Sequence, residues 1–174
     1  VTDSEGKEVV NTTYGALLED GDYQITLPAG DYILEARSTK DVPVAEFEQP
    51  VYGTSKEFSI TAGETTYAGD LVCTLLQCKV TVSYSEEFLA SVTGAGKTTV
   101  NVKAGYPLEY VLNANGTYDQ SAGYFAVEGN TMTVVFSGNI EGKSQKMTKS
   151  FTNIAPKQWR QIKFIKKVNE QGNA

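Results

Sequence analysis

The sequence predicts an all-β fold made of two tandem small β-sandwich domains that share a long connecting strand segment. Three observations point to it. Apolar and polar residues alternate with a period of two along most of the chain, turn residues recur about every 8–12 positions, and only one short segment resembles a helix. The 174 residues suffice for one large β domain or two small ones, and 40% hydrophobic residues can form a real core.

The N-terminal third predicts a hairpin and a further strand. A turn is expected at 28–30, since proline presets φ for a turn and glycine permits positive φ. The flanking strands are 22–27 and 31–38, and the next strand is 56–60. Tyr23, Ile25 and Leu27 are expected to share one face, and Phe58 and Ile60 are expected to point inward.

The segment 67–84 is predicted to be one continuous strand. Residues 78–84 alternate cleanly, whereas 71–76 is apolar at both parities. A strand that is buried on both faces must be covered on both sides, so we expect this segment to cross from one domain to the next. We therefore place the boundary near Leu76.

The resulting organisation is an N-terminal β-sandwich domain at 1–76, a C-terminal β-sandwich domain at 77–168 and a polar tail or linker at 169–174. A single sandwich is the alternative. One helix is predicted in the C-terminal half, at 85–92, with Ser85 as its N-cap and two glutamates in its first turn. The strand residues expected to point inward there are Val100, Val102, Leu108, Tyr110, Leu112, Met132, Val134, Phe136, Ile162, Phe164 and Val168.

The two cysteines are predicted to be buried free thiols. Cys73 and Cys78 stand five positions apart on one predicted strand, which separates them by about 16 Å and places them on opposite faces. A disulfide needs Cα atoms within about 7 Å.

Composition and charge weigh against several classes of function. The net charge of −6 and the pI near 4.7 argue against a nucleic acid or an anionic membrane as partner. The chain has no histidine, which removes histidine acid–base chemistry and the commonest metal ligand. We expect no catalytic residue, no cofactor and no metal site. The one basic cluster, Lys163, Lys166 and Lys167, is interpreted as a solvated strand face and tail.

The motif GAGKTT at 94–99 is similar to the end of a phosphate-binding loop. Such a loop needs a helix after it, whose N-terminus helps to bind phosphate. The residues that follow are β-branched and alternate, so we predict a glycine-rich hairpin loop, with Thr98 starting a strand, and no nucleotide.

Three aromatic residues are candidates for ligand binding: Tyr52, Tyr118 and Trp159. A flat ring can stack on the apolar face of a sugar, and loop residues carry function more often than core residues do. Half-buried packing is the other interpretation of each. A calcium loop or an acidic turn at 19–22, and a carboxylate enzyme with two carboxyl groups about 5–10 Å apart, also stay open.

The order of several segments resembles an uncharacterised family of Bacteroides-type surface lipoproteins. The resemblance spans about Tyr14 to Phe164. It departs from the family pattern at 49–52, where one tyrosine follows the proline instead of two, and at 157–159, where glycine and an aromatic are usual. The segments are ITLPAGDYILEA, FEQPVYGTSKEFSITAGETT, CTLLQCKVTVSYSEEF, AGYFAVEGNTMTVVFSG and KSFTNIAPKQWRQIKF.

The resemblance implies tandem transthyretin-like, immunoglobulin-like or fimbrillin-type β-sandwich modules and no known catalytic residues. It implies export, display on the outer membrane surface or outside the cell, and membrane association only through an N-terminal lipid anchor removed from this chain. We therefore expect a non-catalytic surface module with an adhesive or spacer role, whose partner is a host or bacterial surface glycan or protein. A carbohydrate-binding module is the alternative.

Overall fold

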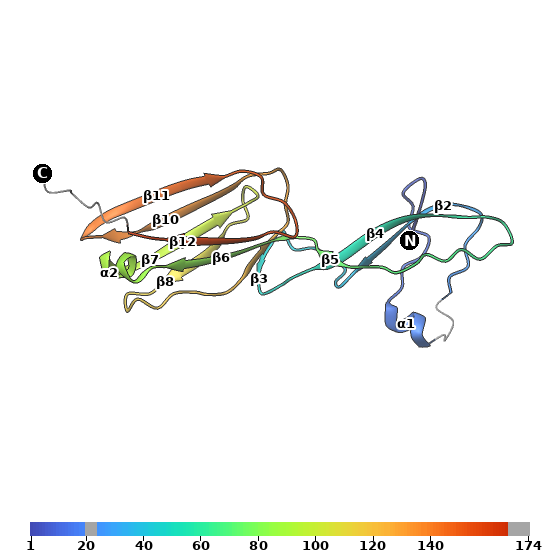
Figure 1. Ribbon diagram of the computed structural model, residues 1–174, viewed down its shortest axis with the longest axis horizontal. Helices are drawn as coiled ribbons and strands as arrows, with labels where there is room; N and C mark the ends of the chain where they lie inside the picture. The colour runs from blue at the N-terminus through green and yellow to red at the C-terminus, as the bar shows by residue number, and fades with distance from the viewer. Residues whose placement is uncertain (20–23, 167–174) are drawn as a thin grey trace, which may run out of the picture. The chain divides into compact units, whose positions relative to one another are not determined.

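This computed structural model describes residues 1–19 and 24–166, and the protein is an all-β protein with two short helices in that part (Figure 1). The predicted all-β fold is confirmed. The elements are β1 (Thr2–Asp3), α1 (Tyr14–Glu19), β2 (Gly30–Arg37), β3 (Ala45–Phe47), β4 (Tyr52–Ile60), β5 (Thr74–Leu75), β6 (Cys78–Tyr84), α2 (Glu86–Ser91), β7 (Val92–Asn101), β8 (Leu108–Leu112), β9 (Gly123–Phe125), β10 (Met132–Ile140), β11 (Lys143–Phe151) and β12 (Trp159–Phe164).

The chain divides into two compact units. The N-terminal unit comprises Val1–Lys40 and Tyr52–Thr74, and the C-terminal unit comprises Asp41–Val51 and Leu75–Ala174. The segment Asp41–Val51 goes with the C-terminal unit because its strand β3 pairs with β9. Independent folding of two domains, with the boundary between residues 76 and 77, stays a prediction. The predicted tail at 169–174 lies outside the described residues.

The N-terminal unit is built on one sheet with the strand order β1-β2-β4-β5. The central pair β2 and β4 is antiparallel, with Tyr32 opposite Phe58, and its two faces differ. One face carries apolar side chains and the other carries mainly polar ones such as Asp31 and Glu57, as period-two alternation requires. Tyr32 is the one large apolar side chain that is buried among the described residues of this unit.

The predicted strand at 22–27 is wrong over its described part. Residues 24–27 form no strand, because the two neighbours of β2 in the sheet are β1 and β4. The expected hairpin across 28–30 is therefore absent as well, whereas β2 itself and the shared face of Phe58 and Ile60 are confirmed. The carbonyl of Pro28 instead accepts a hydrogen bond from the Tyr32 hydroxyl at 2.9 Å. Tyr23 and part of the acidic segment 19–22 lie outside the described residues.

The C-terminal unit is a sandwich of two four-stranded sheets. One sheet has the order β11-β10-β7-β8 and the other has the order β12-β6-β9-β3. All neighbouring strands are antiparallel except β12 and β6, which run parallel. The inward residues predicted from alternation are confirmed for β8 and β10 and for Val100 and Val102, while Val168 lies outside the described residues.

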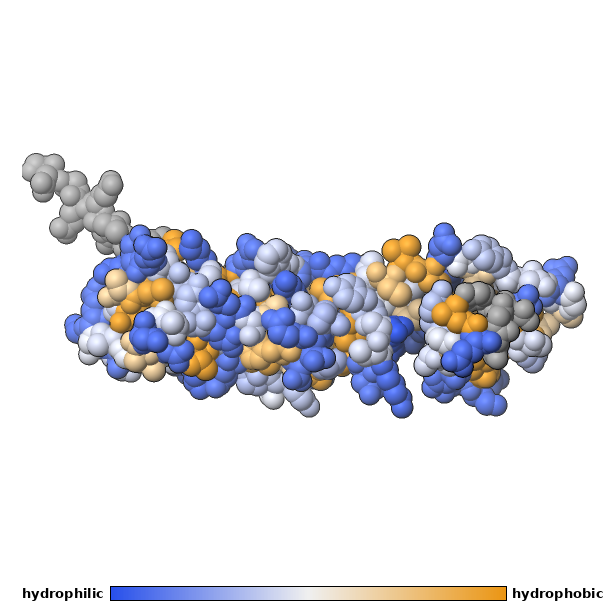
Figure 2. Space-filling model, turned by 90° about the horizontal axis from the view of Figure 1, so that it is seen from below, coloured by the Kyte–Doolittle hydropathy of each residue, from blue (hydrophilic) through white to orange (hydrophobic). Residues whose placement is uncertain are grey.

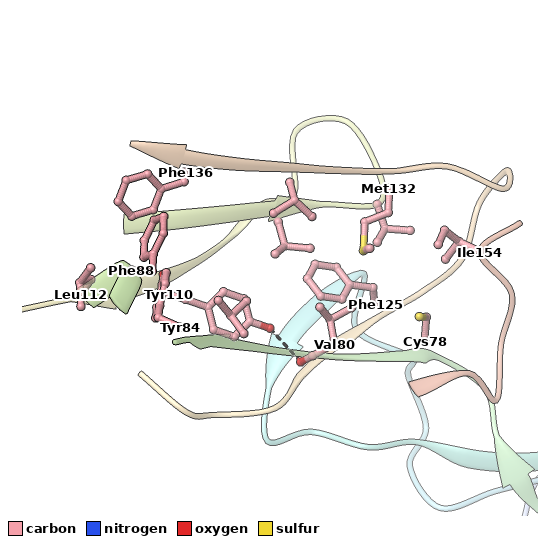
Figure 3. Packing of buried hydrophobic residues seen from close by; sticks show 14 residues of the cluster. Cys78, Val80, Tyr84, Phe88, Tyr110, Leu112, Phe125, Met132, Phe136 and Ile154 are labelled. Carbon is pink, nitrogen blue, oxygen red and sulfur yellow. Dashed lines mark hydrogen bonds between the residues drawn. The ribbon is translucent and has the colours of Figure 1, made fainter. Parts of the chain in front are cut away.

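Side chains from both sheets form a continuous core between them (Figure 3). Tyr110 of β8 is fully buried and its hydroxyl donates to the backbone carbonyl of Val80 in β6 at 3.0 Å. A second bond joins the hydroxyls of Tyr84 and Thr98, which are 2.7 Å apart. These bonds satisfy buried polar atoms and fix the spacing of the two layers.

The predicted continuous strand 67–84 is broken in the structure. Only β5 and β6 are formed, and the chain leaves the strand path at 76–77. There the amide of Leu76 donates to the carbonyl of Val51, and the buried side chain of Gln77 accepts from the Val51 amide at 2.8 Å. A buried glutamine must be hydrogen-bonded, so it draws the backbone of the 41–51 segment to this point.

The predictions of free thiols and of a helix at 85–92 are confirmed, and the predicted burial of Cys73 is wrong. Both cysteines are free, but Cys73 is exposed and only Cys78 is buried, because the strand expected to bury Cys73 does not form. The predicted helix is α2, and the Ser85 hydroxyl caps it by accepting from the Phe88 amide at 3.2 Å.

The motif at 94–99 lies within β7, so the predicted hairpin loop is wrong. Gly96 already pairs with Leu112 of β8, and Thr98 is a buried strand residue and not the start of a strand. No helix follows the motif between residues 100 and 166. Lys97 pairs instead with Glu109 of β8.

Candidate surface site on the C-terminal unit

The parallel pairing of β12 with β6 sets the candidate site. Trp159 lies opposite Lys79, Gln161 opposite Thr81, and Lys163 opposite Ser83. In each strand the intervening residues point to the core, so these side chains share the outer face of the sheet. We call this set the Trp159 face; it consists of Trp159, Gln161, Lys163, Lys79, Thr81 and Ser83.

Trp159, the single tryptophan of the chain, is exposed and held in place. The residue is 57% exposed. In general a tryptophan in a protein core buries about 150–250 Å² of surface, so this exposure is unusual for its type. The indole Nε1–H donates to Thr81 Oγ1 at 3.0 Å, so its one polar atom is bonded to the sheet. A large part of the apolar ring therefore faces solvent in a fixed orientation.

Lys79 lies next to this ring. Its Nζ is 4.7 Å from the centroid of the Trp159 ring, which is a cation–π geometry. Among the described residues, Lys79 makes no ion pair with a carboxylate, whereas Lys97, Lys103 and Lys166 each have one. The Trp159 face thus combines an apolar ring with an ammonium group that has no carboxylate partner in the described chain.

The far end of the Trp159 face approaches the start of α2. The backbone N–H of Glu87 and the Ser85 hydroxyl lower the pKa of the Glu87 carboxyl, and the charge of Lys163 adds to this effect. The Glu87 carboxylate therefore partly balances the charge of Lys163. Lys79 is the cation of the face that is closest to the exposed ring.

The structure does not bring the three predicted ligand residues together. Tyr52 is the first residue of β4 in the N-terminal unit, with an exposed side chain. Tyr118 packs edge-on against Tyr84, with ring centroids 5.0 Å apart. Tyr84 faces the core and lies five residues along β6 from Lys79, the partner of Trp159, which is about 16 Å along the strand. Tyr118 and Trp159 therefore lie at opposite ends and on opposite faces of that sheet.

A shallow hollow of about 400 Å³ lies on the N-terminal sheet. It is lined by Asp31, Glu57 and Ser59, and the Ser59 hydroxyl donates to Asp31 at 2.6 Å. Both carboxyl groups belong to exposed residues of a polar sheet face. A carboxyl group that acts as a general acid needs a buried surrounding that favours its neutral form, which this open face does not provide.

The strongest pKa shifts belong to the core of the C-terminal unit. Burial raises the pKa of the Cys78 thiol to about 11 and raises the pKa values of Tyr84 and Tyr110 above their ordinary range. These groups are thereby held neutral and away from the range near pH 7 that acid–base catalysis uses. They have the chemistry of packing residues.

Exposed apolar side chains are scattered. On the face drawn in Figure 2, hydrophobic residues form small separate groups among hydrophilic ones.

In the part of the chain that the structure describes, no helix is long and apolar enough to cross a membrane, and no group of three or more carboxylate or thiol side chains is placed to hold a metal ion.

Sequence reasoning singled out Trp159 but missed its neighbours Lys79 and Thr81. The alternation in 78–84 does place both on one face of a strand, and that is the signal the sequence offers. The missing information is the pairing of β12 with β6, which joins residues 80 positions apart, Trp159 and Lys79.

Comparisons with known proteins identify the family. The family model described as "Domain of unknown function (DUF4493)" matches residues 1–174, so the chain belongs to this family. A search of curated proteins gives no match. Among solved structures the chain is similar to one described as a "putative cell adhesion protein" from Bacteroides fragilis, with 11% identity and a TM-score of 0.38. The similarity covers 84% of this chain and 64% of that protein.

Proposed function

We propose that this member of the DUF4493 family is a non-catalytic binding module of the bacterial cell surface with an adhesive role. The observation that carries the proposal is the Trp159 face, where an exposed indole ring is fixed by the bond from Nε1 to Thr81. Fixed aromatic side chains are typical centres of binding surfaces, because they offer a large contact area at a low cost in conformational entropy.

A non-catalytic role is supported by where the titratable groups lie. The thiol and phenol groups with raised pKa values are packed in the core, and the carboxylates of the N-terminal hollow are open to solvent. Location at the cell surface, anchoring through lipid and the fimbrillin-like character rest on the sequence resemblance, and they are part of the proposal.

A carbohydrate-binding module is the second candidate, and it is favoured by the neighbours of the ring. Thr81 and Gln161 offer hydroxyl and amide groups near an exposed ring, and Ser83 adds a hydroxyl further along the face, which suits a ligand that is apolar on one face and hydroxylated at its rim. The two candidates differ in the ligand and share the same surface.

Binding of the purified chain to a panel of surface glycans and extracellular matrix proteins tests the proposal. We expect at least one ligand to bind and Trp159→Ala to lose it, while the ligand is recovered chemically unchanged. The matched control is Tyr106→Ala, which removes another exposed aromatic ring. Equal binding by wild type and Trp159→Ala, or turnover of the ligand, would contradict the proposal.

A further inference from the structure

We propose that the Trp159 face binds an acidic polysaccharide, with the indole ring stacked on a sugar ring and the Lys79 ammonium paired with a sugar carboxylate. The inference rests on the proposed function and names the class of ligand for the same surface. Its basis is the juxtaposition of the exposed ring and the ammonium group 4.7 Å from the ring centroid.

The ring is ready for stacking without rearrangement. Because Nε1 already donates to Thr81 at 3.0 Å, a ligand that covers the ring leaves no indole N–H unbonded. Stacking of a flat ligand on an aromatic side chain stabilises nucleic-acid complexes, and a sugar ring offers a similar apolar face.

The ammonium group selects for negative charge. Lys79 is half-buried beside the ring and makes no ion pair with a described carboxylate, so a ligand carboxylate would be its first anionic partner in that part of the chain. A hydrogen bond between ionised groups is about twice as strong as a neutral one.

The strands that carry the ring and the ammonium group do not oppose an anion. The chain carries −6 overall, which would repel a polyanion. However, β12 carries Arg160 and Lys163, β6 carries Lys79, and neither strand contains an acidic residue.

A sugar fits the face better than an acidic peptide does. Beyond Lys79 and the ring, the Trp159 face continues with the neutral polar side chains of Thr81, Gln161 and Ser83, which can exchange hydrogen bonds with hydroxyl groups of a flat ligand. An acidic peptide is the competing occupant, and the experiment includes it.

The chain contains a matched pair for comparison. Lys103 Nζ lies 5.8 Å from the centroid of the Tyr106 ring, and that ring is also exposed. The ammonium of Lys103, however, already pairs with Glu128 at 2.5 Å. If an unpaired ammonium is what selects the ligand, this second site binds no acidic sugar.

The experiment measures binding of the full chain to polygalacturonate and to its fully methyl-esterified form, which has the same backbone without the charge. We expect binding to polygalacturonate that weakens with salt, and weaker binding to the ester. Trp159→Ala should lose at least about tenfold in affinity and Lys79→Gln about fivefold to tenfold. Lys79→Gln should also bind both polymers nearly equally. Tyr106→Ala and Lys103→Gln should bind like the wild type.

The outcomes separate the inference from the proposed function. Equal binding of both polymers, lost in Trp159→Ala, would keep the surface as a binding site and overturn the acidic preference. Polyglutamate binding as tight as polygalacturonate, or an unchanged affinity in Lys79→Gln, would also overturn it. If no polysaccharide binds, the inference fails, while the protein ligands of the earlier panel still test the proposed function. Circular dichroism of each variant, and Trp159→Phe with its intact ring, distinguish lost contacts from a lost fold.

Discussion

The two units of the molecule use the same kind of strand but bury very different amounts of it. The C-terminal unit closes two four-stranded sheets over a continuous core, whereas the N-terminal unit has one sheet and buries a single large apolar side chain, Tyr32, among its described residues. The strands of the N-terminal unit thus pair without a second sheet over them. A second layer is needed to remove its apolar face from water.

Charge separates the units in the same direction. The N-terminal unit has 11 acidic and 4 basic residues, a net charge of −7, and the C-terminal unit has 10 and 11, a net charge of +1. Like charges on a small unit oppose its compact state. We therefore expect the C-terminal unit to be the stable frame that holds the Trp159 face, and the N-terminal unit to open at lower free energy.

The largest expected effect is the loss of a core ring in the C-terminal unit. Phe136 is fully buried and packs against Phe88 and Phe164, with ring centroids 5.3 and 5.6 Å away. Phe136→Ala should lower the free energy of unfolding by about 3–5 kcal/mol. Urea denaturation followed by the fluorescence of Trp159 measures this, because the single tryptophan lies in the same unit.

The matched change in the other unit is Phe58→Ala. Phe58 is only half-buried and stacks on Tyr32 at 5.7 Å between centroids. We expect that variant to change the Trp159 transition by less than about 0.5 kcal/mol. Equal shifts in the two variants would show that the two units unfold as one.

A smaller effect is expected at Gly123, where the core has no room for a side chain. A Cβ at Gly123 would collide with the Tyr110 hydroxyl and lie 2.9 Å from a methyl carbon of Leu108. Gly123→Ala should therefore cost about 1–3 kcal/mol, partly by displacing Tyr110 from its bond to Val80. Gly15→Ala in helix α1, with no contact nearer than 3.9 Å, is the control and should be neutral or stabilising by up to about 1 kcal/mol. Similar losses in both would contradict the packing described for Gly123.

The core of the C-terminal unit should also weaken at high pH. Burial raises the pKa of Cys78 from 9.0 to about 11, so the folded state holds its proton where the unfolded state releases it. The stabilisation is complete below pH 9 and is lost as the pH rises through about 11, by roughly 2 kcal/mol. Unfolding free energies measured between pH 8 and 11 should fall more steeply in the wild type than in Cys78→Ala. Parallel curves would contradict a buried neutral thiol.

The smallest expected effect concerns the motif at 94–99. Lys97 and Glu109 form an exposed pair on β7 and β8, so Lys97→Ala should change stability by less than about 0.5 kcal/mol. Calorimetric titration with ATP should show no heat of binding for wild type or variant. An ATP affinity that disappears in Lys97→Ala would contradict the assignment of this motif to a strand without a ligand.

The strands and core were predicted more accurately in the C-terminal unit than in the N-terminal unit, and the difference has a physical reason. In the C-terminal unit the alternation around Tyr110, Phe136 and Val80 predicted the core correctly, because two opposed layers bury one parity of each strand. In the N-terminal unit the alternation at 22–27 had the same appearance, but the strand is not formed, because alternation does not tell whether a pairing edge exists.

The candidate site was predictable in part. Trp159 stood out as the single tryptophan at a strand start, whereas Lys79 was not singled out, although the alternation of 78–84 separates it from the parity of Val80. Their contact depends on a parallel pairing between distant strands, which no local pattern encodes. The interruption of the predicted strand at Gln77 had the same cause, since its partners Val51 and Pro43 are distant in sequence.

Native-state hydrogen exchange of the full chain tests the contrast between the units most directly. We expect amides of β6, β7 and β10 to exchange only through global unfolding of the C-terminal unit, and those of β2 and β4 to exchange through openings of much lower free energy. Exchange of β2 and β4 with the same free energy as β6 would contradict the claim that the C-terminal unit alone is the stable frame of the Trp159 face.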